Sequence, residues 1–206
     1  MSVVLGLDVS TKTGFAVGNI DKDGALSFNK YGLIKLPRPA KTYGVFPWCF
    51  VEASRALVKQ ISETFDSVSP DVVVIENTNL GKSRMSQKML EWAHLTLLTF
   101  LEGKAEIVYL SSSEWRSGLG LQMSKEDKKN NKKLKAAKAD AEATGSKLDK
   151  ASLGVKGKVG YKHLAVRYAN DRFGFAFKMK DNDIADAVGL VAAYAAGVRS
   201  KDSAED

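Results

Sequence analysis

The sequence predicts an α/β domain in which a mixed five-stranded sheet carries helices on both faces. Three strand-like runs joined by short turns fill the first 36 residues, which indicates an antiparallel meander. Beyond residue 50, helical patterns alternate with short β-branched runs, as in sheets covered by helices. With 206 residues and 44% hydrophobic residues, the chain can bury one substantial core. We therefore expect a single domain over residues 1–206, with a basic insertion at about 124–160.

Strands are predicted where apolar or β-branched runs end in a turn signal. The first three runs are joined by short turns, and Asp21-Lys22-Asp23-Gly24 is the clearest of these turns. The fourth run reads Val-Val-Val-Ile, which is typical of a strand buried on both faces. The predicted strands are residues 3–7, 15–20, 26–36, 72–75 and 107–110.

Helices are predicted where apolar residues recur every three or four positions. Ser112 or Ser113 is expected to cap a brief helix through Trp115, because serine favours the N-cap position. The longer predicted helices are residues 51–65, 84–101, 132–143, 162–173 and 183–196.

The net charge of +7 lies in one stretch of the chain. Between Ser124 and Lys162 there are twelve lysines and five acids, whereas the rest of the chain has 19 basic and 19 acidic residues. A solvated linker would explain this stretch, and so would a strip that binds phosphates and releases counterions. The candidate phosphate-binding residues are Lys128, Lys129, Lys132, Lys133, Lys158 and Lys162.

Several classes of protein are disfavoured by composition. Cys49 is the only cysteine, so the sequence lacks a disulfide framework and a cysteine-rich zinc site, and Cys49 itself reads as a small core residue. The longest apolar stretch, Ala187 to Val198, is too short to span a bilayer, and the N-terminus shows no signal segment. We expect a cytoplasmic protein with no membrane partner, in the host cytoplasm if the chain is viral.

Four acids occupy positions where carboxylates have a functional use. Asp8 and Glu76 follow buried strands, and Asp183 and Asp186 lie three residues apart at the start of a helix, on one face. Each has an ordinary structural explanation. Asp8 could begin a turn, Glu76 could pair with a lysine, and Asp183 could be stabilised by the dipole at the N-terminus of its helix. Together they predict a site for Mg²⁺ or Mn²⁺, because clustered carboxylates repel one another unless cations bind.

These acids lie in segments that resemble the motifs of one family. Residues 4–10, Val-Leu-Gly-Leu-Asp-Val-Ser, resemble the first motif of the RuvC-type Holliday junction resolvases of the RNase H-like superfamily. Residues 73–76, Val-Val-Ile-Glu, resemble their second motif, and residues 183–187, Asp-Ile-Ala-Asp-Ala, their last. The longer basic insertion is closer to phage or viral members of the family.

The resemblance implies an RNase H-like fold and a metal-dependent endonuclease that cleaves four-way DNA junctions. In that family the four carboxylates, here Asp8, Glu76, Asp183 and Asp186, hold two divalent ions, Mg²⁺ or Mn²⁺, and cleavage leaves 5′-phosphate and 3′-hydroxyl ends. The segment 77–84 departs from the bacterial pattern, because it lacks the aromatic residue that wedges into the junction.

Two neighbouring features are open to more than one interpretation. His163 follows Tyr161 and Lys162 and could act near the metals, although a surface or core histidine is the commoner case. Trp115 and Arg116 could stack on and pair with DNA, but Trp115 is expected mainly as a core residue.

Three other functions share some of these features. An ATP-binding domain of the sugar-kinase and actin type also ends its first strand in Gly-x-Asp, but it needs a second domain and a longer chain. A non-catalytic nucleic-acid-binding module explains the lysines and leaves the four acids unexplained. A nuclease for RNA–DNA hybrids or precursor RNA keeps the fold and changes the substrate.

A homodimer is expected, because a four-way junction has two-fold symmetry and needs two opposed nicks. The helix over residues 84–101 is the candidate interface, although core packing would explain its apolar stripe equally well. That stripe consists of Met85, Met89, Trp92, Leu95 and Leu98.

Overall fold

A mixed five-stranded sheet forms the centre of the computed structural model, which describes residues 1–10, 12–35, 42–77, 84–147, 153 and 157–199. The strand order is β3-β2-β1-β4-β5. The first three strands form an antiparallel meander, β4 runs parallel to β1, and β5 runs parallel to β4. The bounds are β1 (Ser2–Asp8), β2 (Lys12–Ile20), β3 (Leu26–Lys35), β4 (Val72–Glu76) and β5 (Glu106–Leu110).

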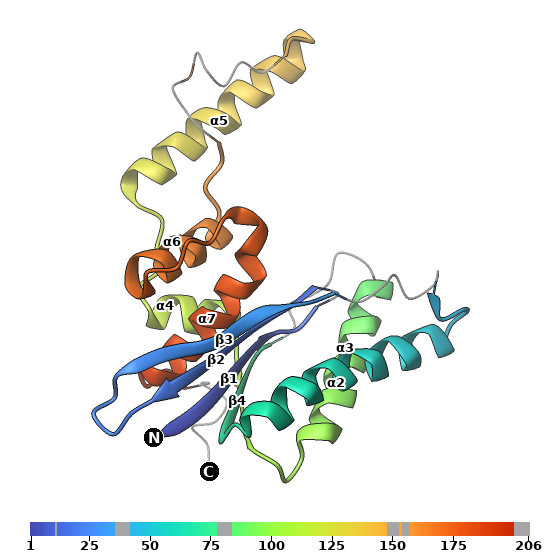
Figure 1. The fold of residues 1–206 in the computed structure, drawn as a ribbon. Helices are drawn as coiled ribbons and strands as arrows, with labels where there is room; N and C mark the ends of the chain where they lie inside the picture. The colour runs from blue at the N-terminus through green and yellow to red at the C-terminus, as the bar shows by residue number, and fades with distance from the viewer. Residues whose placement is uncertain (11, 36–41, 78–83, 148–152, 154–156, 200–206) are drawn as a thin grey trace.

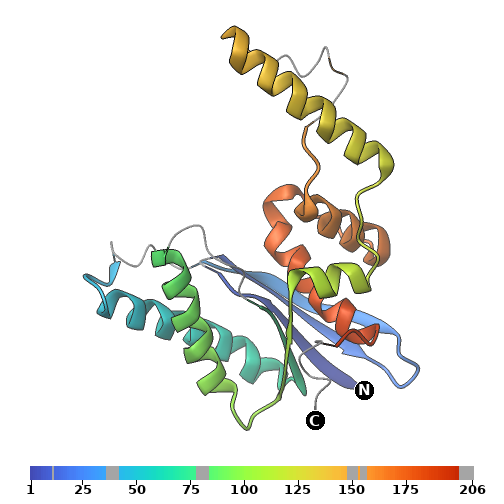
Figure 2. The same cartoon turned by 180° about the vertical axis from the view of Figure 1, so that it is seen from behind.

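Helices cover both faces of this sheet, which confirms the predicted architecture (Figures 1 and 2). One face carries α2 (Trp48–Val68) and α3 (Arg84–Leu101). The other carries α4 (Ser112–Gly118), α6 (Tyr161–Phe173) and α7 (Asn182–Ala195), with the short helix η1 (Met179–Asp181) before α7. Helix α5 (Lys125–Thr144) projects away from the sheet and its helices (Figure 1).

Alternation along the strands divides the core into two layers. Val4 on β1 and Val74 on β4 belong to the layer beneath α7, whereas Leu5 and Leu7 belong to the layer beneath α2 and α3. Because successive strand residues point to opposite faces, Asp8 and Glu76 share the α7 face of the sheet.

Two glycines let α7 lie directly on the sheet. A Cβ atom on Gly14 of β2 would stand 1.9 Å from the carbonyl oxygen of Asp183, and one on Gly6 of β1 would stand 2.5 Å from that of Ala187. These contacts lie one helical turn apart on α7. The close approach brings the first turn of α7 over the end of β1, where Asp8 lies.

The N-termini of α4 and α5 differ from the sequence-based prediction because of their capping residues. The predicted caps of α4, Ser112 and Ser113, are wrong: Ser111 is the N-cap, its side chain accepts from the Glu114 amide, and the Glu114 side chain accepts from the Ser111 amide. Helix α5 begins at Lys125 instead of residue 132, because Ser124 caps a polar first turn that contains no apolar periodicity.

Burial confirms the prediction that Cys49 and Trp115 are core residues, and it bears on whether the apolar stripe of α3 packs in the core or lies on the surface. Cys49 and Trp115 are buried core residues. The buried residues of α3 are Ala93, His94, Leu97 and Leu101, whereas two residues of the apolar stripe noted from the sequence, Met85 and Leu95, are exposed and its other three are half-buried. Among the described helices, none is both long and apolar enough to cross a membrane.

Candidate active site

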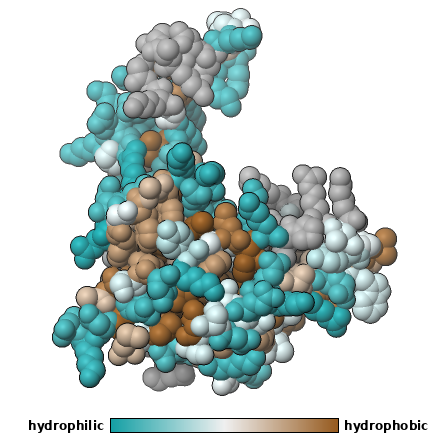
Figure 3. All heavy atoms as spheres, in the orientation of Figure 1, coloured by the Kyte–Doolittle hydropathy of each residue, from teal (hydrophilic) through white to brown (hydrophobic). Residues whose placement is uncertain are grey.

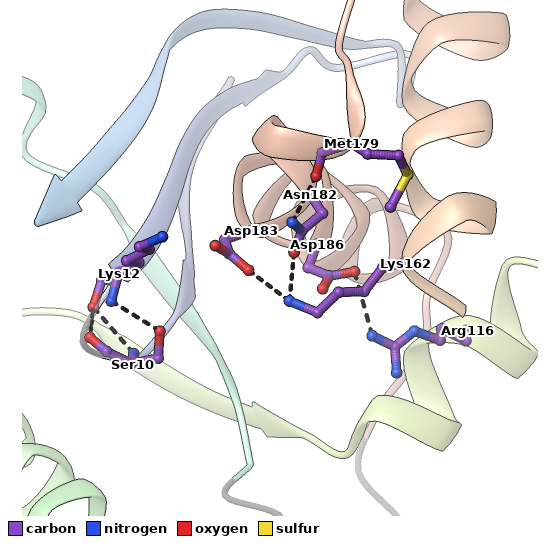
Figure 4. A network of polar contacts seen from close by, with 9 residues as sticks. Ser10, Lys12, Arg116, Lys162, Met179, Asn182, Asp183 and Asp186 are labelled. Carbon is purple, nitrogen blue, oxygen red and sulfur yellow. Dashed lines mark hydrogen bonds and ion pairs between the residues drawn. The ribbon is translucent and has the colours of Figure 1, made fainter. Parts of the chain in front are cut away.

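The four predicted acids meet at one end of the sheet. Leu7 pairs with Ile75 in the parallel β1–β4 ladder, so the following residues, Asp8 and Glu76, end neighbouring strands. Together with Asp186 they line a cavity of about 610 Å³ on the α7 side. Asp183 lies one turn earlier on α7 and forms an ion pair with Lys162, which lines the same cavity (Figure 4).

Burial makes Asp8, Glu76 and Asp186 hard to ionise, and repulsion between carboxylates adds to this effect at Asp8 and Asp186. Burial raises the pKa of Asp8 well above its ordinary value, and the charges of Asp186, Glu76 and Asp183 raise it further. Burial also raises the pKa of Glu76, and it raises the pKa of Asp186 to about 6. The acids therefore face one another closely enough to interact by charge, although they come from separate elements.

Two cationic side chains stand among the acids. The Lys162 ammonium donates to Asp183 Oδ1 at 2.6 Å and also to the side-chain oxygen of Asn182 (Figure 4). Burial lowers the pKa of Lys162, but the hydrogen bond to Asp183 and the charges of Asp183, Asp186 and Asp8 together raise it by more. Arg116 donates to Asp186 Oδ1 at 3.3 Å, and only 14% of its side chain is exposed.

Glu76 is held from behind by a core residue. The indole N–H of Trp115 donates to Glu76 Oε2 at 3.2 Å, and this hydrogen bond lowers the pKa of Glu76 against the larger effect of burial. The Trp115 ring fits against Gly189 of α7, where a Cβ atom would come within 2.5 Å of the ring. The Arg116 guanidinium lies 4.4 Å from the ring centre. In the part of the chain that the structure describes, Glu76 thus pairs with an indole and not with a lysine.

The rest of the cavity wall comes from the segment that leads into α6, from the first turn of α6 and from η1. Lys158, Tyr161, His163 and Met179 line it. His163 Nδ1 accepts from the Gly160 amide at 3.1 Å, so this histidine closes the first turn of α6 in addition to facing the cavity. The segment 78–83, which follows Glu76, lies outside the described residues.

The other predicted lysines lie on the projecting arm, which we define as residues 124–147 and 157–160. Lys128, Lys129, Lys132 and Lys133 are exposed on α5, and hydrophilic side chains dominate this part of the surface (Figure 3). The structure brings Lys158 and Lys162 to the acids, whereas these four stand apart from the cavity.

Two polar contacts fix the base of the arm. Asp127 forms an ion pair with Arg167 of α6 at 3.0 Å. The Asn131 side chain accepts from the Val159 amide at 2.9 Å and donates to the Val159 carbonyl at 2.7 Å. The outgoing and returning chains of the arm are therefore joined where they leave the domain.

The donor chemistry of the cavity fits a hard divalent cation. Within the described residues, no three Asp, Glu, His or Cys side chains lie close enough together to hold a metal ion as they stand. The four carboxylates nevertheless offer only oxygen ligands, and the repulsion that raises the pKa of Asp8 is the kind that a cation relieves.

Sequence reasoning found the acids but missed their partners. The Trp115–Glu76 and Arg116–Asp186 contacts join residues 39 and 70 positions apart, and no local pattern encodes such pairs. The Ser111 cap could have been predicted from the sequence, because Glu114 follows Ser111 at the spacing of a capping box.

Comparisons with known proteins show the fold. No protein-family model matches the chain, and no curated protein matches its sequence. RuvC from T. thermophilus, in complex with a Holliday junction substrate, aligns with a TM-score of 0.56 and 13% identity over 94% of this chain and 93% of that one.

Two further solved structures agree with this result. A second structure of Thermus thermophilus RuvC aligns with a TM-score of 0.54 and 17% identity over 96% of this chain and 98% of that one. The yeast mitochondrial Holliday junction resolvase aligns with a TM-score of 0.53 and 14% identity over 95% and 78%. The chain thus has the RuvC-like form of the RNase H fold, as the sequence motifs predicted.

Proposed function

We propose that this protein is a divalent-metal-dependent endonuclease that cleaves branched DNA, with the four-way Holliday junction as its substrate. The observation that carries the proposal is the convergence of Asp8, Glu76 and Asp186, with Asp183 beside them, on one cavity at the ends of β1 and β4. The same fold occurs in RuvC, one structure of which is a complex with a Holliday junction substrate.

The chain's own residues divide the work of hydrolysis between them. Asp8, Glu76, Asp183 and Asp186 would hold two Mg²⁺ or Mn²⁺ ions, which when bound polarise the phosphodiester and make water a better nucleophile. Trp115 orients Glu76, and Arg116 orients Asp186. Cleavage of the bond between phosphorus and the 3′ oxygen leaves a 5′-phosphate and a 3′-hydroxyl.

Lys162 is placed to transfer its hydrogen bond from Asp183 to a phosphate of the substrate during this reaction. Its side chain is 52% exposed, and its ammonium lies at the cavity in an ion pair with Asp183. An incoming phosphate offers it a second anionic partner, so Lys162 can donate to the substrate while the carboxylates turn to the cations.

The experiment that tests the proposal replaces each acid by its amide, which removes the charge and keeps the shape of the side chain. Asp8→Asn, Glu76→Gln, Asp183→Asn and Asp186→Asn should each lower the nicking rate of a synthetic four-way junction with Mg²⁺ by at least about 100-fold. Junction affinity should stay nearly unchanged, because the arm lysines are untouched. Asp66→Asn, an exposed change on α2 away from the cavity and the arm, is the matched control and should nick normally.

The choice of substrates in this experiment separates the alternatives. A linear duplex and an RNA–DNA hybrid are assayed beside the junction, and cleavage of the hybrid in preference would replace the resolvase by an RNase H-type enzyme. Binding of the junction without any cleavage would leave a non-catalytic nucleic-acid-binding module. Near-normal nicking by one acid variant would remove that residue from the site.

We also propose that the arm lysines bind the phosphates of the junction arms. Replacing Lys128, Lys129, Lys132 and Lys133 together by glutamine should weaken binding and reduce the slope of log affinity against log salt by up to about 3.6, at about 0.9 for each phosphate contact. An equal charge change elsewhere, Lys22, Lys30, Lys59 and Lys104 to glutamine, is the control. An unchanged slope would make the arm a solvated projection.

We propose that the active form is a homodimer that uses the exposed stripe of α3. Met85 is 54% exposed and Leu95 is 66% exposed, and Phe46, Trp48 and Val45 add exposed apolar surface before and at the start of α2. The Phe46 and Trp92 rings lie 6.2 Å apart, which joins the two parts of this surface. Such a surface, used twice, suits a two-fold interface.

Light scattering of the free and junction-bound protein tests the dimer. Wild-type protein should have twice the mass of the chain, and Leu95→Glu should shift it toward the monomer, because the new charge would be buried in the interface. A monomer in both states would contradict the dimer and leave an enzyme that makes single nicks.

A further inference from the structure

A second cavity adjoins the acidic one and shares a wall with it. It encloses about 300 Å³ between α4, the turn after α4 and the start of α6. Arg116 and Tyr161 line both cavities, so a group in the second lies directly beside a phosphate in the first. The remaining lining residues are Ser112, Ser113, Ser117, Leu121 and Gln122.

The lining of this second cavity is suited to a flat, neutral, hydrogen-bonding group. The Gln122 amide and the Ser117 hydroxyl in its lining can both donate and accept hydrogen bonds. Tyr161 contributes an aromatic ring that is 58% exposed. Among the described residues that line it, Arg116 is the one with a charge, and its guanidinium donates to Asp186 at 3.3 Å and to the Ser112 carbonyl at 3.5 Å. A second phosphate would have to compete with Asp186 for this guanidinium.

Size and shape restrict the ligand further. A volume of about 300 Å³ is at the lower limit of small-molecule sites, which span roughly 300–1,000 Å³. The Arg116 guanidinium lies 5.8 Å from the centre of the Tyr161 ring, so two planar groups form the wall that the cavities share. Aromatic rings and guanidinium planes are the surfaces on which unstacked bases rest.

We propose that the second cavity receives one unstacked nucleobase from the strand that is cut. The base belongs to a nucleotide next to the phosphate in the acidic cavity, stacks on Tyr161 and presents its hydrogen-bonding edge to Gln122. This inference rests on the proposed nuclease function and deepens it, because it assigns sequence preference to a named pocket. The aromatic that contacts a base is then supplied by α6, since the segment 77–84 contains no aromatic residue.

The test combines a fluorescent base with a library of cleavage sequences. Junctions with 2-aminopurine at either nucleotide flanking the cut bond are bound with Ca²⁺, and stacking on Tyr161 should quench the emission at one of the two positions. Tyr161→Phe should keep this quenching, because the ring remains, and Tyr161→Ala should lose most of it. Gln122→Ala should flatten the base preference at that position, and Gln122→Glu should change which base is preferred, because a carboxylate only accepts.

The outcomes separate this inference from the proposed function. If wild-type protein cuts junctions but the quenching and base preference are the same in Tyr161→Ala and Gln122→Ala, the pocket does not hold a base and the nuclease proposal stands. If wild-type protein cuts no nucleic acid with Mg²⁺ or Mn²⁺, both proposals fall.

Discussion

Asp186→Asn is expected to stabilise the metal-free protein at alkaline pH while it removes the nuclease activity. Burial raises the pKa of Asp186 to about 6, even though Arg116 lowers it, so the attraction of Arg116 is already contained in that value. Relative to the ordinary 3.8, and at 1.36 kcal/mol per pKa unit, ionised Asp186 lowers the free energy of unfolding by about 3 kcal/mol at pH 8. Asparagine keeps an oxygen that accepts from Arg116 and carries no charge.

The sign of the pH dependence follows from proton binding. The folded protein binds the Asp186 proton more tightly than the unfolded chain does. The contribution of Asp186 to the free energy of unfolding is therefore most favourable below pH 4 and is lost as the pH rises through about 6. The advantage of the Asp186→Asn variant should therefore be about 3 kcal/mol at pH 8 and should shrink by about 2 kcal/mol on going to pH 4.5. In melting temperature the difference at pH 8 is about 6 to 12 °C for a chain of this size.

Urea unfolding in EDTA at pH 8 and pH 4.5 measures both quantities, with Asp140→Asn as the control for a lost surface charge. Adding Mg²⁺ at pH 8 should stabilise the wild-type protein more than the variant, because binding to the folded state adds to its stability. A variant that is no more stable than wild type at pH 8, or whose advantage is the same at both pH values, would refute the reasoning.

Three further predictions concern the same cavity. Trp115→Phe keeps the ring but removes the 3.2 Å hydrogen bond to Glu76, so calorimetry should show Mn²⁺ affinity lowered about tenfold or more; an unchanged affinity would deny the indole this role. Gly14→Ala should lower the free energy of unfolding by at least about 2 kcal/mol in urea titrations, because the new Cβ collides with the Asp183 carbonyl, and a neutral effect would mean that α7 can withdraw from β2. Single-turnover nicking at fixed Mg²⁺ should rise about tenfold between pH 5 and pH 7.5 as Asp186 ionises, whereas a flat profile would show that its charge does not limit the rate.

The fold and the acids could be predicted because both follow from local periodicity. Alternation along β1 and β4 assigns Asp8 and Glu76 to one face, and helical spacing assigns Asp183 and Asp186 to another. The short turns predicted the antiparallel meander of β1 to β3, and the β-branched run predicted a buried β4, but the pairing of β4 beside β1 came from the structure.

Other features depend on tertiary packing and could not be predicted in this way. Helix α3 carries apolar residues on two sides, and only its packing against the sheet shows that Leu97 is buried while Leu95 is exposed. The indole of Trp115 reaches Glu76 because Gly189 leaves space for its ring, a relation between three elements distant in sequence. The length of α5 was underestimated, because its first turns are held by capping and charge and lack an apolar stripe.

The link between Asn131 and Val159 gives the arm an origin that is independent of its length. Helices α4 and α6, which carry Arg116 and Lys162, flank the arm in sequence, and the double hydrogen bond joins the second turn of α5 to the returning chain at Val159. Because the entropy of closing a loop grows only slowly with its length, residues beyond this neck can be added or removed at little cost to the domain. The length of the arm, and so its reach along a bound duplex, can therefore change by evolution or by design without a change in the residues of the acidic cavity.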